Sequence, residues 1–409
     1  MTASRDRKYA SLIIRSGIAL REGQPVRIMT EVVNSYFARL LVEEAYDAGA
    51  SLVDIQYTDM PLERIRLDRT RDSKLLEMVP SWSAAMYEAI LDEDWAAIAL
   101  RGTENPDLME GVDAGRLGAL RSAAALSRKV FSEGISANRI AWNVCLWPTR
   151  SWARKVLAGV FPDWERRIWD ELIPILRLDR DDPAAAWLEQ DRELKRRAAF
   201  LDGRSYTAFR FRGPGTDLTI GMKPDRTWTG GSCVSKGGSR FFPNIPTEEV
   251  FSTPDRSATT GSVRCSRPVE VLGSRVSGAW FRFESGRVTE FGADTNAEVL
   301  GQFLDIEENA RFAGEIALVG IDSPIFTSGL VYYNTLLDEN AASHIALGNG
   351  YRDCIRGGTA MEREELVETA CNVSLVHVDF MIGSDEVSVF GVDGSGCEEI
   401  IIRDGVFVI

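Results

Sequence analysis

The chain changes character near its middle, and this change constrains the fold more than any other feature of the sequence. Up to about residue 200, helical patterns alternate with short apolar runs that are typical of strands. Beyond residue 203, glycine-rich turns separate short runs of strand-forming residues. A chain of 409 residues also exceeds the length at which a single hydrophobic core stops growing. The sequence therefore predicts two domains, residues 1–202 and residues 203–409.

The first domain is predicted to be an α/β domain with a mostly parallel sheet. Strand-like runs at residues 25–30, 51–57, 95–100 and 139–146 alternate with helical patterns at residues 8–19, 34–48, 73–91 and 114–133. Strands that alternate with helices are joined by right-handed crossovers, which place neighbouring strands in a parallel sheet. Residues 151–201 are helical in pattern, with breaks at Pro162 and Pro183, and are predicted to form a helical connector that closes this domain.

The second domain is predicted to be β-rich and of the α+β class. Strand-like runs at residues 206–211, 218–221, 269–272 and 279–283 are separated by turn signals such as Gly213-Pro214-Gly215 and Gly230-Gly231. Helical patterns at residues 296–309 and 362–370 interrupt the strands. Neither this pattern nor the alternating one specifies a function.

Charge and composition exclude several classes of function. The net charge of −14 argues against nucleic acid or an anionic membrane as the main partner. No run of 18 apolar residues occurs, and the N-terminal segment lacks the features of a signal peptide. The six cysteines are scattered without a C-x-x-C pair, which favours neither a disulfide framework nor a zinc ribbon. Phosphate-binding glycine motifs are absent, and we expect a cytoplasmic protein that binds no nucleotide.

Only two histidines occur, and both lie in acidic surroundings near the C-terminal end. His344 follows the acidic stretch 338–340, and His377 precedes Asp379 by two residues within an apolar run. Residues i and i+2 of a strand point to the same face, so His377 and Asp379 would project together toward one ion. A buried histidine with a purely structural role is the commoner case for any single histidine. The shared acidic context favours metal binding here.

Three glutamates extend the set of candidate ligands. Glu249 follows two prolines in Pro243-Asn244-Ile245-Pro246-Thr247-Glu248-Glu249. Thr247 with the following acids could also start a helix as a capping box, but the continuation at residues 250–254 has an extended pattern. Glu315 begins a short apolar strand and could equally be a solvated strand end, whereas Glu339 lies five residues before His344.

Two chemistries fit these residue types. Two histidines and one carboxylate suffice for a mononuclear site of the facial-triad or hydrolytic zinc type. A set of two histidines and four carboxylates suits two divalent ions about 3.5–4 Å apart, bridged by a carboxylate and a water. The full candidate set is Glu249, Glu315, Glu339, His344, His377 and Asp379.

Five sequence blocks resemble the thermophilic metallo-aminopeptidase family, the group of aminopeptidase T, aminopeptidase S and PepS-like enzymes. The resemblance covers essentially the whole chain, and four of the blocks follow the family's order in the second domain. The blocks are Gly213-Pro214-Gly215-Thr216-Asp217-Leu218-Thr219, residues 242–251, residues 333–341, His344-Ile345-Ala346-Leu347-Gly348, and residues 377–383.

The resemblance implies a metal-dependent aminopeptidase with a dinuclear catalytic site in the β-rich domain. It assigns all six candidate residues as ligands, with Glu315 as the bridge, to two divalent ions per chain (zinc, cobalt or manganese). It also places Tyr351 near the metals as a catalytic hydrogen-bond donor, although an ordinary loop tyrosine is the alternative. It further implies short peptide substrates and a homodimer whose active sites face an enclosed cavity.

The sequence departs from the family at several positions and leaves alternatives open. Asp255 stands where the family usually has a histidine, and we expect it to lie just outside the ligand set. Lys236 and Arg240 are expected to line the pocket, and Glu248 is a candidate proton shuttle. A ring-cleaving dioxygenase with one iron, held by His344, His377 and Asp379, is the main alternative. A metal-binding relative without enzyme activity is a third.

Overall fold

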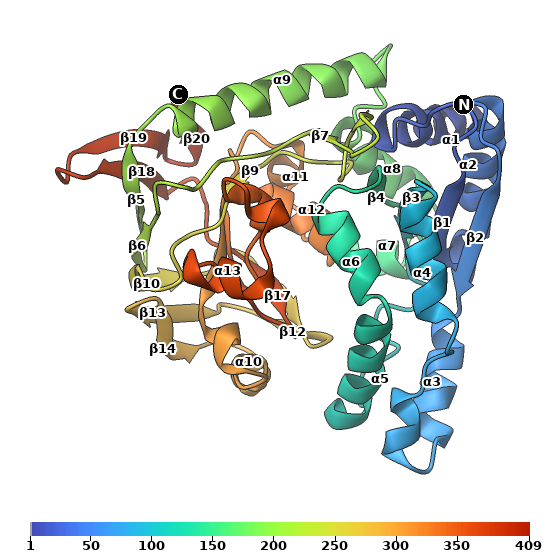
Figure 1. The fold of residues 1–409 in the computed structure, drawn as a ribbon, viewed down its shortest axis with the longest axis horizontal. Coiled ribbons are helices and arrows are strands. Elements are labelled where there is room, and N and C mark those ends of the chain that lie inside the picture. The colour runs from blue at the N-terminus through green and yellow to red at the C-terminus, as the bar shows by residue number, and fades with distance from the viewer. Residues whose placement is uncertain (1) are drawn as a thin grey trace. The chain divides into compact units, whose positions relative to one another are not determined.

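The computed structural model describes residues 2–409, and the chain forms two compact units (Figure 1). Unit 1 comprises Met1–Trp187 and Ser232–Ile245, and unit 2 comprises Leu188–Gly231 and Pro246–Ile409. The long helix α9 (Pro183–Asp202) continues from the first unit into the second, and Pro183 begins it. The domain boundary expected after residue 202 stays a prediction.

Unit 1 contains the parallel sheet that the sequence predicts. Its four strands have the order β2-β1-β3-β4, and every neighbouring pair is parallel. A two-stranded ribbon from the 232–245 segment also belongs to this unit. The strands are β1 (Val26–Glu31), β2 (Val53–Thr58), β3 (Ala96–Arg101), β4 (Trp142–Leu146), β7 (Cys233–Val234) and β8 (Arg240–Phe241).

The helices of unit 1 largely follow the predicted alternation. The chain passes through a helix between successive strands of the sheet, as parallel pairing requires. The helices are α1 (Thr2–Leu12), α2 (Ser35–Asp47), α3 (Met60–Arg69), α4 (Ser83–Asp92), α5 (Ala114–Ser127), α6 (Lys129–Ser136), α7 (Arg150–Val156) and α8 (Trp164–Ile175).

Three predicted helices are divided in the structure. The helix predicted at 73–91 is a 3₁₀ helix (Ser73–Glu77) followed by α4, because Pro80 between them cannot continue a helix. The helix predicted at 114–133 is interrupted after Ser127, whose hydroxyl donates to the Ala124 carbonyl and competes with the helical hydrogen bonds. The helix predicted at 8–19 begins earlier and ends in a π-helical turn, Ile13–Gly17. Helix α3 was not predicted.

Aromatic side chains pack the helices of unit 1 together. The Tyr9 ring of α1 stacks on Phe37 of α2 with centroids 5.0 Å apart, and Phe37 stacks on Trp147 at 4.3 Å. Trp169 of α8 meets Trp147 edge-on at 5.2 Å. Such ring pairs add to the free energy gained by burying their area. Helices α4 and α6 form a second cluster with β3, made of Tyr87, Ile90, Leu91, Ala97, Phe131 and Ile140.

Unit 2 is rich in strands, as predicted, and contains a large antiparallel sheet. Its eight strands have the order β14-β13-β10-β6-β5-β18-β19-β20. They are β5 (Tyr206–Gly213), β6 (Thr216–Gly221), β10 (Thr259–Arg264), β13 (Trp280–Glu284), β14 (Arg287–Gly292), β18 (Ser388–Asp393), β19 (Glu398–Arg403) and β20 (Val406–Phe407). A separate hairpin pairs β11 (Val269–Val271) with β12 (Ser274–Val276).

A second, four-stranded antiparallel sheet completes unit 2. Its order is β17-β16-β15-β9, and its strands are β9 (Val250–Ser252), β15 (Ala313–Leu318), β16 (His344–Gly348) and β17 (His377–Met381). The apolar sides of the two sheets share one core, in which Phe281 of β13 meets Phe380 of β17 edge-on at 4.8 Å. The sheet that carries both histidines is therefore backed by the main core of the unit.

Short helices connect the strands of unit 2. The helix predicted at 296–309 ends at Leu304 and is followed by a 3₁₀ helix, Glu308–Arg311, whereas the one predicted at 362–370 is confirmed. Glu362 and Glu365 form a reciprocal capping box at the start of that last helix. The helices are α10 (Ala297–Leu304), α11 (Pro324–Thr327), α12 (Thr335–Asp338) and α13 (Arg363–Glu368).

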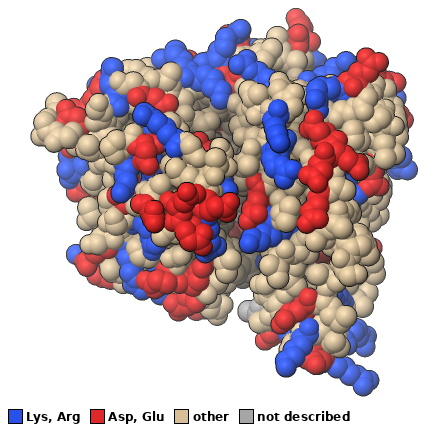
Figure 2. Space-filling model, viewed as in Figure 1, with Lys and Arg blue, Asp and Glu red and all other residues tan. Residues whose placement is uncertain are grey.

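Acidic and basic side chains are interspersed on the face shown in Figure 2. An acidic group lies over α13, where Glu362, Glu364, Glu365 and Glu368 are exposed. Within residues 2–409, none of the helices combines the length and the apolar composition that crossing a membrane requires.

Candidate metal centre

The register of the four-stranded sheet of unit 2 places charged side chains on one face. Across β15, β16 and β17, Glu315 pairs with Ala346 and Ala346 pairs with Asp379. His344 and His377 lie two residues from members of this row, so they point to the same side. The alternate residues point into the core, among them Ile316, Leu318, Ile345, Leu347 and Phe380. One face of this sheet therefore holds four potential ligands, and the other holds apolar core.

Small residues leave room on the charged face. Ala317, Ala346 and Gly348 occupy the positions between the four potential ligands. A Cβ on Gly348 would collide with the Val376 carbonyl, and its φ of +110° also favours glycine. A Cβ on Gly314, at the bulge beside Glu315, would collide with the Gly348 carbonyl. These residues keep the strands close and the face open for an ion.

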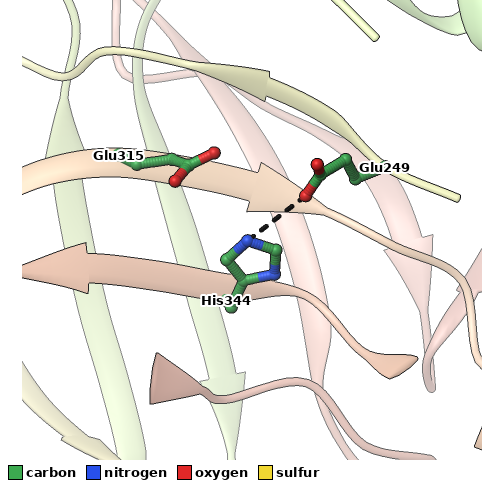
Figure 3. A group of neighbouring side chains, drawn as sticks. All are labelled: Glu249, Glu315 and His344. Atoms are coloured by element: carbon green, nitrogen blue, oxygen red, sulfur yellow. Dashed lines mark ion pairs between the residues drawn. The ribbon is translucent and has the colours of Figure 1, made fainter. Parts of the chain in front are cut away.

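Glu249 joins this face from the segment that leads into β9. No helix starts at Thr247, so the extended interpretation of residues 250–254 is confirmed for β9 and the capping-box alternative is wrong. The Glu249 Oε2 atom lies 3.3 Å from Nε2 of His344. Together with Glu315 these residues offer three ligand atoms within 4.8 Å of one another, and all three residues are buried. Figure 3 shows the two carboxyl groups pointing toward one another beside the His344 ring.

A second group shares Glu315 with the first. The Nε2 atom of His377 lies 3.2 Å from Oε2 of Glu315 and 3.1 Å from Oδ1 of Asp379. These three ligand atoms also lie within 4.8 Å of one another. Because His377 and Asp379 are two residues apart on β17, the local prediction that they project together is confirmed. Glu315 is the one residue common to both groups.

Backbone carbonyls orient both histidine rings. Nδ1 of His377 lies 2.7 Å from the Asn349 carbonyl, and Nδ1 of His344 lies 3.2 Å from the Ala342 carbonyl. A carbonyl only accepts, so Nδ1 carries the proton in each ring. Nε2 of a neutral ring then presents a lone pair to the carboxylates, which is the arrangement of metal-ligating histidines.

The facing acceptor atoms fit a divalent cation. Glu249 Oε2 and Asp379 Oδ1 are buried and receive no hydrogen bond from any residue in the described range 2–409. Two atoms held about 2.1 Å from one tetrahedral ion lie about 3.4 Å apart. The distances of 3.1–3.3 Å between the histidine and carboxylate atoms are close to this value. Lone pairs that face each other at such distances require a proton or a cation between them.

Burial and crowding of like charges shift the pKa values of this group. Burial raises the pKa of Glu249 to about 8, although the His344 charge opposes it. Burial alone would lower the pKa of His377, but Asp379 and Glu315 raise it well above its usual value. The pKa of Asp379 is also raised by burial, yet the His377 charge lowers it overall. The protein without metal therefore holds protons where the protein with metal would hold cations.

Comparison with known proteins shows the family. A family model described as thermophilic metalloprotease (M29) matches residues 3–407. This chain belongs to that family. It is 39% identical over 404 residues to an aminopeptidase T of Thermus aquaticus, covering 98% of each chain, and 33% identical over 398 residues to aminopeptidase AmpS of Bacillus subtilis, covering 97% of each. A solved structure of wild-type AmpT from Thermus thermophilus superposes with a TM-score of 0.93 at 38% identity over 100% of both chains.

Membership of the M29 family makes this chain a metal-dependent peptidase. The two-unit α/β and β-rich architecture is confirmed by the structural match over the whole chain. The match does not favour the ring-cleaving dioxygenase that the two histidines and Asp379 left open, and the non-enzymatic alternative is not supported.

Tyr351 lies beside the candidate metal-binding group of this M29 peptidase. Its hydroxyl is 3.3 Å from Nε2 of His377, and its ring packs on Phe251 with centroids 5.1 Å apart. Burial, and then the surrounding carboxylates, raise the pKa of Tyr351 well above its usual value. The phenol therefore keeps its proton and can donate a hydrogen bond at neutral pH.

Glu339 lies near both groups but belongs to neither. It lines a cavity together with His377 and Asp379, and the Asn340 side chain donates to it at 3.4 Å. Burial, and then repulsion from Glu249 and Asp379, raise the pKa of Glu339 well above its usual value. The carboxylates of the two groups therefore repel a negative charge on Glu339, and a bound cation would reduce this repulsion.

Four other predicted residues lie in different settings. The Glu248 carboxylate is buried and accepts a hydrogen bond of 2.7 Å from Gln190. Asp255 accepts hydrogen bonds from the Ser257 N–H and hydroxyl in a local turn. Lys236 and Arg240 belong to unit 1, whereas all six candidate ligands belong to unit 2. The roles expected for these four residues stay predictions.

Sequence reasoning missed the residues that hold the ligands in place. The carbonyls of Asn349 and Ala342 orient the rings, and a carbonyl carries no sequence signal because every residue has one. The Thr253 hydroxyl donates to the Tyr351 carbonyl at 3.0 Å and accepts from the Tyr351 N–H at 2.7 Å. Thr253 follows β9 directly, and its place in the same short segment as the candidate ligand Glu249 was the available signal.

Proposed function

We propose that this M29 peptidase is an aminopeptidase that removes N-terminal residues from short peptides, using two divalent metal ions bound to unit 2. The names of the relatives support the reaction, because both sequence relatives are aminopeptidases. The sharing of Glu315 between two groups of ligand atoms supports two ions and carries the proposal furthest. A carboxylate with an oxygen for each ion is a common bridge between paired metals.

Six residues would hold the ions. Glu249 and His344 would serve one ion, and His377 and Asp379 the other, with Glu315 between them. Glu339 would complete the shell from the side of the cavity that it shares with His377 and Asp379. When bound, zinc, cobalt or manganese ions supply a water of lowered pKa, a polarised carbonyl and an anchor for the free amine.

Tyr351 would act on the oxyanion that develops at the scissile carbonyl. Its protonated hydroxyl points at the edge of the ligand group, 3.3 Å from Nε2 of His377. A positioned donor of this kind stabilises the transition state more than the ground state, because the negative charge on the oxygen grows along the reaction. We further propose that the protein acts as a homodimer in the cytoplasm, as the resemblance to its family implies.

Metal titration with matched substrates tests this function. The chelated protein is titrated with zinc, cobalt or manganese, bound metal is counted by mass spectrometry, and hydrolysis of leucyl-p-nitroanilide and of a leucine-initiated tripeptide is followed. We expect two ions per chain at full activity. The same tripeptide with an acetylated amine should resist cleavage, because the free amine would have lost its anchor.

Two results would contradict the proposal in different ways. Full activity with one ion per chain would contradict the proposed dinuclear site but leave the proposed aminopeptidase activity in place. Cleavage of the acetylated peptide at a rate similar to that of the free one would remove the requirement for a free amine.

A further inference from the structure

A small cavity adjoins the metal-binding group of unit 2. Glu339, His377 and Asp379 form one wall of it. The other walls come from the start of the β11–β12 hairpin, from residues 331–338 and from β17. The remaining lining includes the apolar residues Pro268, Val269, Val331, Tyr333, Val378 and Met381 together with polar and charged residues such as Glu270 and Arg275. A group held at the metal centre could therefore extend an apolar substituent directly into the cavity.

The size of the cavity limits what it can receive. Its volume is about 130 Å³. A dry cavity of roughly 150 Å³ holds one benzene molecule. The cavity therefore suits a branched aliphatic side chain or a single aromatic ring, and a double ring would exceed it.

Tyr333 in the cavity wall has a backbone conformation that tyrosine rarely adopts. Its φ is +52°, in the left-handed region. Bulky residues are disfavoured there because Cβ approaches the backbone, and glycine or asparagine is the usual choice. A residue held in such a conformation at a cavity wall points to a function that needs its side chain at that place.

Neighbouring residues hold the peptide groups on both sides of Tyr333. The buried Asp338 carboxylate accepts a hydrogen bond of 2.8 Å from the Tyr332 N–H and another of 3.1 Å from the Asn334 N–H. Arg267 donates to the Leu330 carbonyl at 2.8 Å, just upstream. These hydrogen bonds fix the left-handed turn at Tyr333 and with it the direction of the side chain.

The ring of Tyr333 also has a cation beside it. The Arg275 guanidinium of β12 lies 4.9 Å from the ring centroid. This cation–π contact favours the placement of the ring in the cavity wall. The aromatic surface is therefore positioned before any substrate arrives.

We propose that this cavity receives the side chain of the substrate's N-terminal residue, and that Tyr333 is the residue that determines its specificity. The inference rests on the proposed aminopeptidase function. The Tyr333 ring packs against branched aliphatic or single-ring side chains. An alanine side chain is too short to use the contact, and a tryptophan side chain is too large for the cavity.

Two substitutions of Tyr333 test the proposal. Tyr333→Asn keeps a residue that tolerates positive φ but removes the ring, and Tyr333→Phe keeps the ring as a matched control. Activity is measured on alanyl-, leucyl-, phenylalanyl- and tryptophanyl-p-nitroanilides with the metal-loaded protein. In Tyr333→Asn we expect kcat/KM for the leucyl and phenylalanyl substrates to fall about 10- to 30-fold, mainly through KM. We expect the alanyl substrate to change less than about threefold, and Tyr333→Phe to resemble the parent protein.

The outcomes separate this inference from the function on which it rests. Unchanged selectivity in Tyr333→Asn, or an equal loss on all four substrates, overturns the role of Tyr333 while the aminopeptidase stands. Absence of cleavage by the metal-loaded parent protein overturns the proposed function itself. Metal content and thermal unfolding are measured in parallel. If Tyr333→Asn fails to fold, Tyr333→Gly, which also suits positive φ, takes its place with the same expectations.

Discussion

The molecule contains two four-stranded sheets that use their faces in opposite ways. The parallel sheet β2-β1-β3-β4 of unit 1 buries apolar side chains in β3, and β1 buries Arg27 and Thr30 beside the apolar Val26 and Ile28. The antiparallel sheet β17-β16-β15-β9 of unit 2 has one apolar face in the core and one face with buried carboxylates, the buried His344 and the partly buried His377. The first sheet supports the fold, whereas one face of the second carries the candidate metal ligands.

The difference has an energetic consequence. Removing apolar area from water stabilises a fold, and this stabilisation needs no ligand. Burying several carboxylates is unfavourable unless a cation compensates them. The antiparallel sheet should therefore depend on metal for its stability, and the parallel sheet should not.

Substituting one buried polar residue in each sheet should give the largest difference in activity and stability between the two sheets. Glu315→Gln removes the carboxylate common to both ligand groups, and we expect kcat/KM to fall at least about 10³-fold because both ions lose a ligand. The unfolding temperature of its metal-free form should equal or exceed that of the parent, since one carboxylate of the crowded buried group has gone. Peptidase assays and calorimetry measure these two quantities, and metal counting shows how many ions remain bound.

Thr30→Val in β1 is the matched change in the parallel sheet. The Thr30 hydroxyl is buried and donates to the Leu100 carbonyl at 2.9 Å. We expect a loss of about 1–2 kcal/mol in unfolding free energy with unchanged activity per bound metal. A Glu315→Gln protein that kept both ions and full activity would remove the distinction between the two sheets.

Tyr351→Phe should have the next largest effect. The phenol is a protonated donor 3.3 Å from Nε2 of His377, and loss of one oxyanion donor costs about 3 kcal/mol, or about 100-fold in kcat. KM and metal content should change little, because the hydroxyl is assigned to the transition state rather than to binding. A rise in KM with constant kcat would show instead that Tyr351 binds substrate.

The sequence reveals the parallel sheet better than the site, because the signals differ in range. Helix and strand alternation is local, so the strands of unit 1 appear where they are predicted, while Pro80 still divides a predicted helix. His377 and Asp379 were also a local prediction, since they share one strand. Glu249 and Glu315 come together only through the pairing of β9 with β15, and no local pattern encodes that register. Only the resemblance to a family connected them.

The dependence of stability on pH gives a third test of the difference between the parallel and the antiparallel sheet. In the metal-free protein, burial raises the pKa of Glu249 to about 8, and neighbouring carboxylates raise the pKa of His377. Groups whose pKa is higher in the folded state bind more protons there than in the unfolded state, so their contribution is lost as pH rises. We expect the metal-free protein to lose on the order of 2 kcal/mol between pH 5 and pH 8, or about 4–8 °C in unfolding temperature.

Metal should abolish this loss, because cations then replace the protons. Calorimetry of the metal-free and metal-loaded forms at several pH values measures it. Equal slopes in the two forms would indicate that the carboxylate face does not govern stability.

Thr253 offers the smallest and most specific test, because it concerns how the antiparallel sheet positions a neighbouring loop. Thr253 follows β9, and its hydroxyl bonds both the carbonyl and the N–H of Tyr351. Thr253→Val keeps the shape but removes both bonds, and we expect kcat to fall about tenfold with little change in KM, since a misplaced donor weakens only the transition state. Thr253→Ser should stay within about twofold of the parent.

Thr259→Val is the matched control within the same unit. Thr259 is fully buried, and its hydroxyl has no hydrogen-bond partner among residues 2–409. The same loss of a hydroxyl should therefore leave kcat unchanged. If Thr253→Val and Thr259→Val lowered kcat equally, the effect would come from packing in unit 2. A loss of kcat in Thr253→Val alone, together with near-normal kcat in Thr253→Ser, would show that the Thr253 hydroxyl positions Tyr351. The segment around β9 would then position Tyr351 as well as carry Glu249.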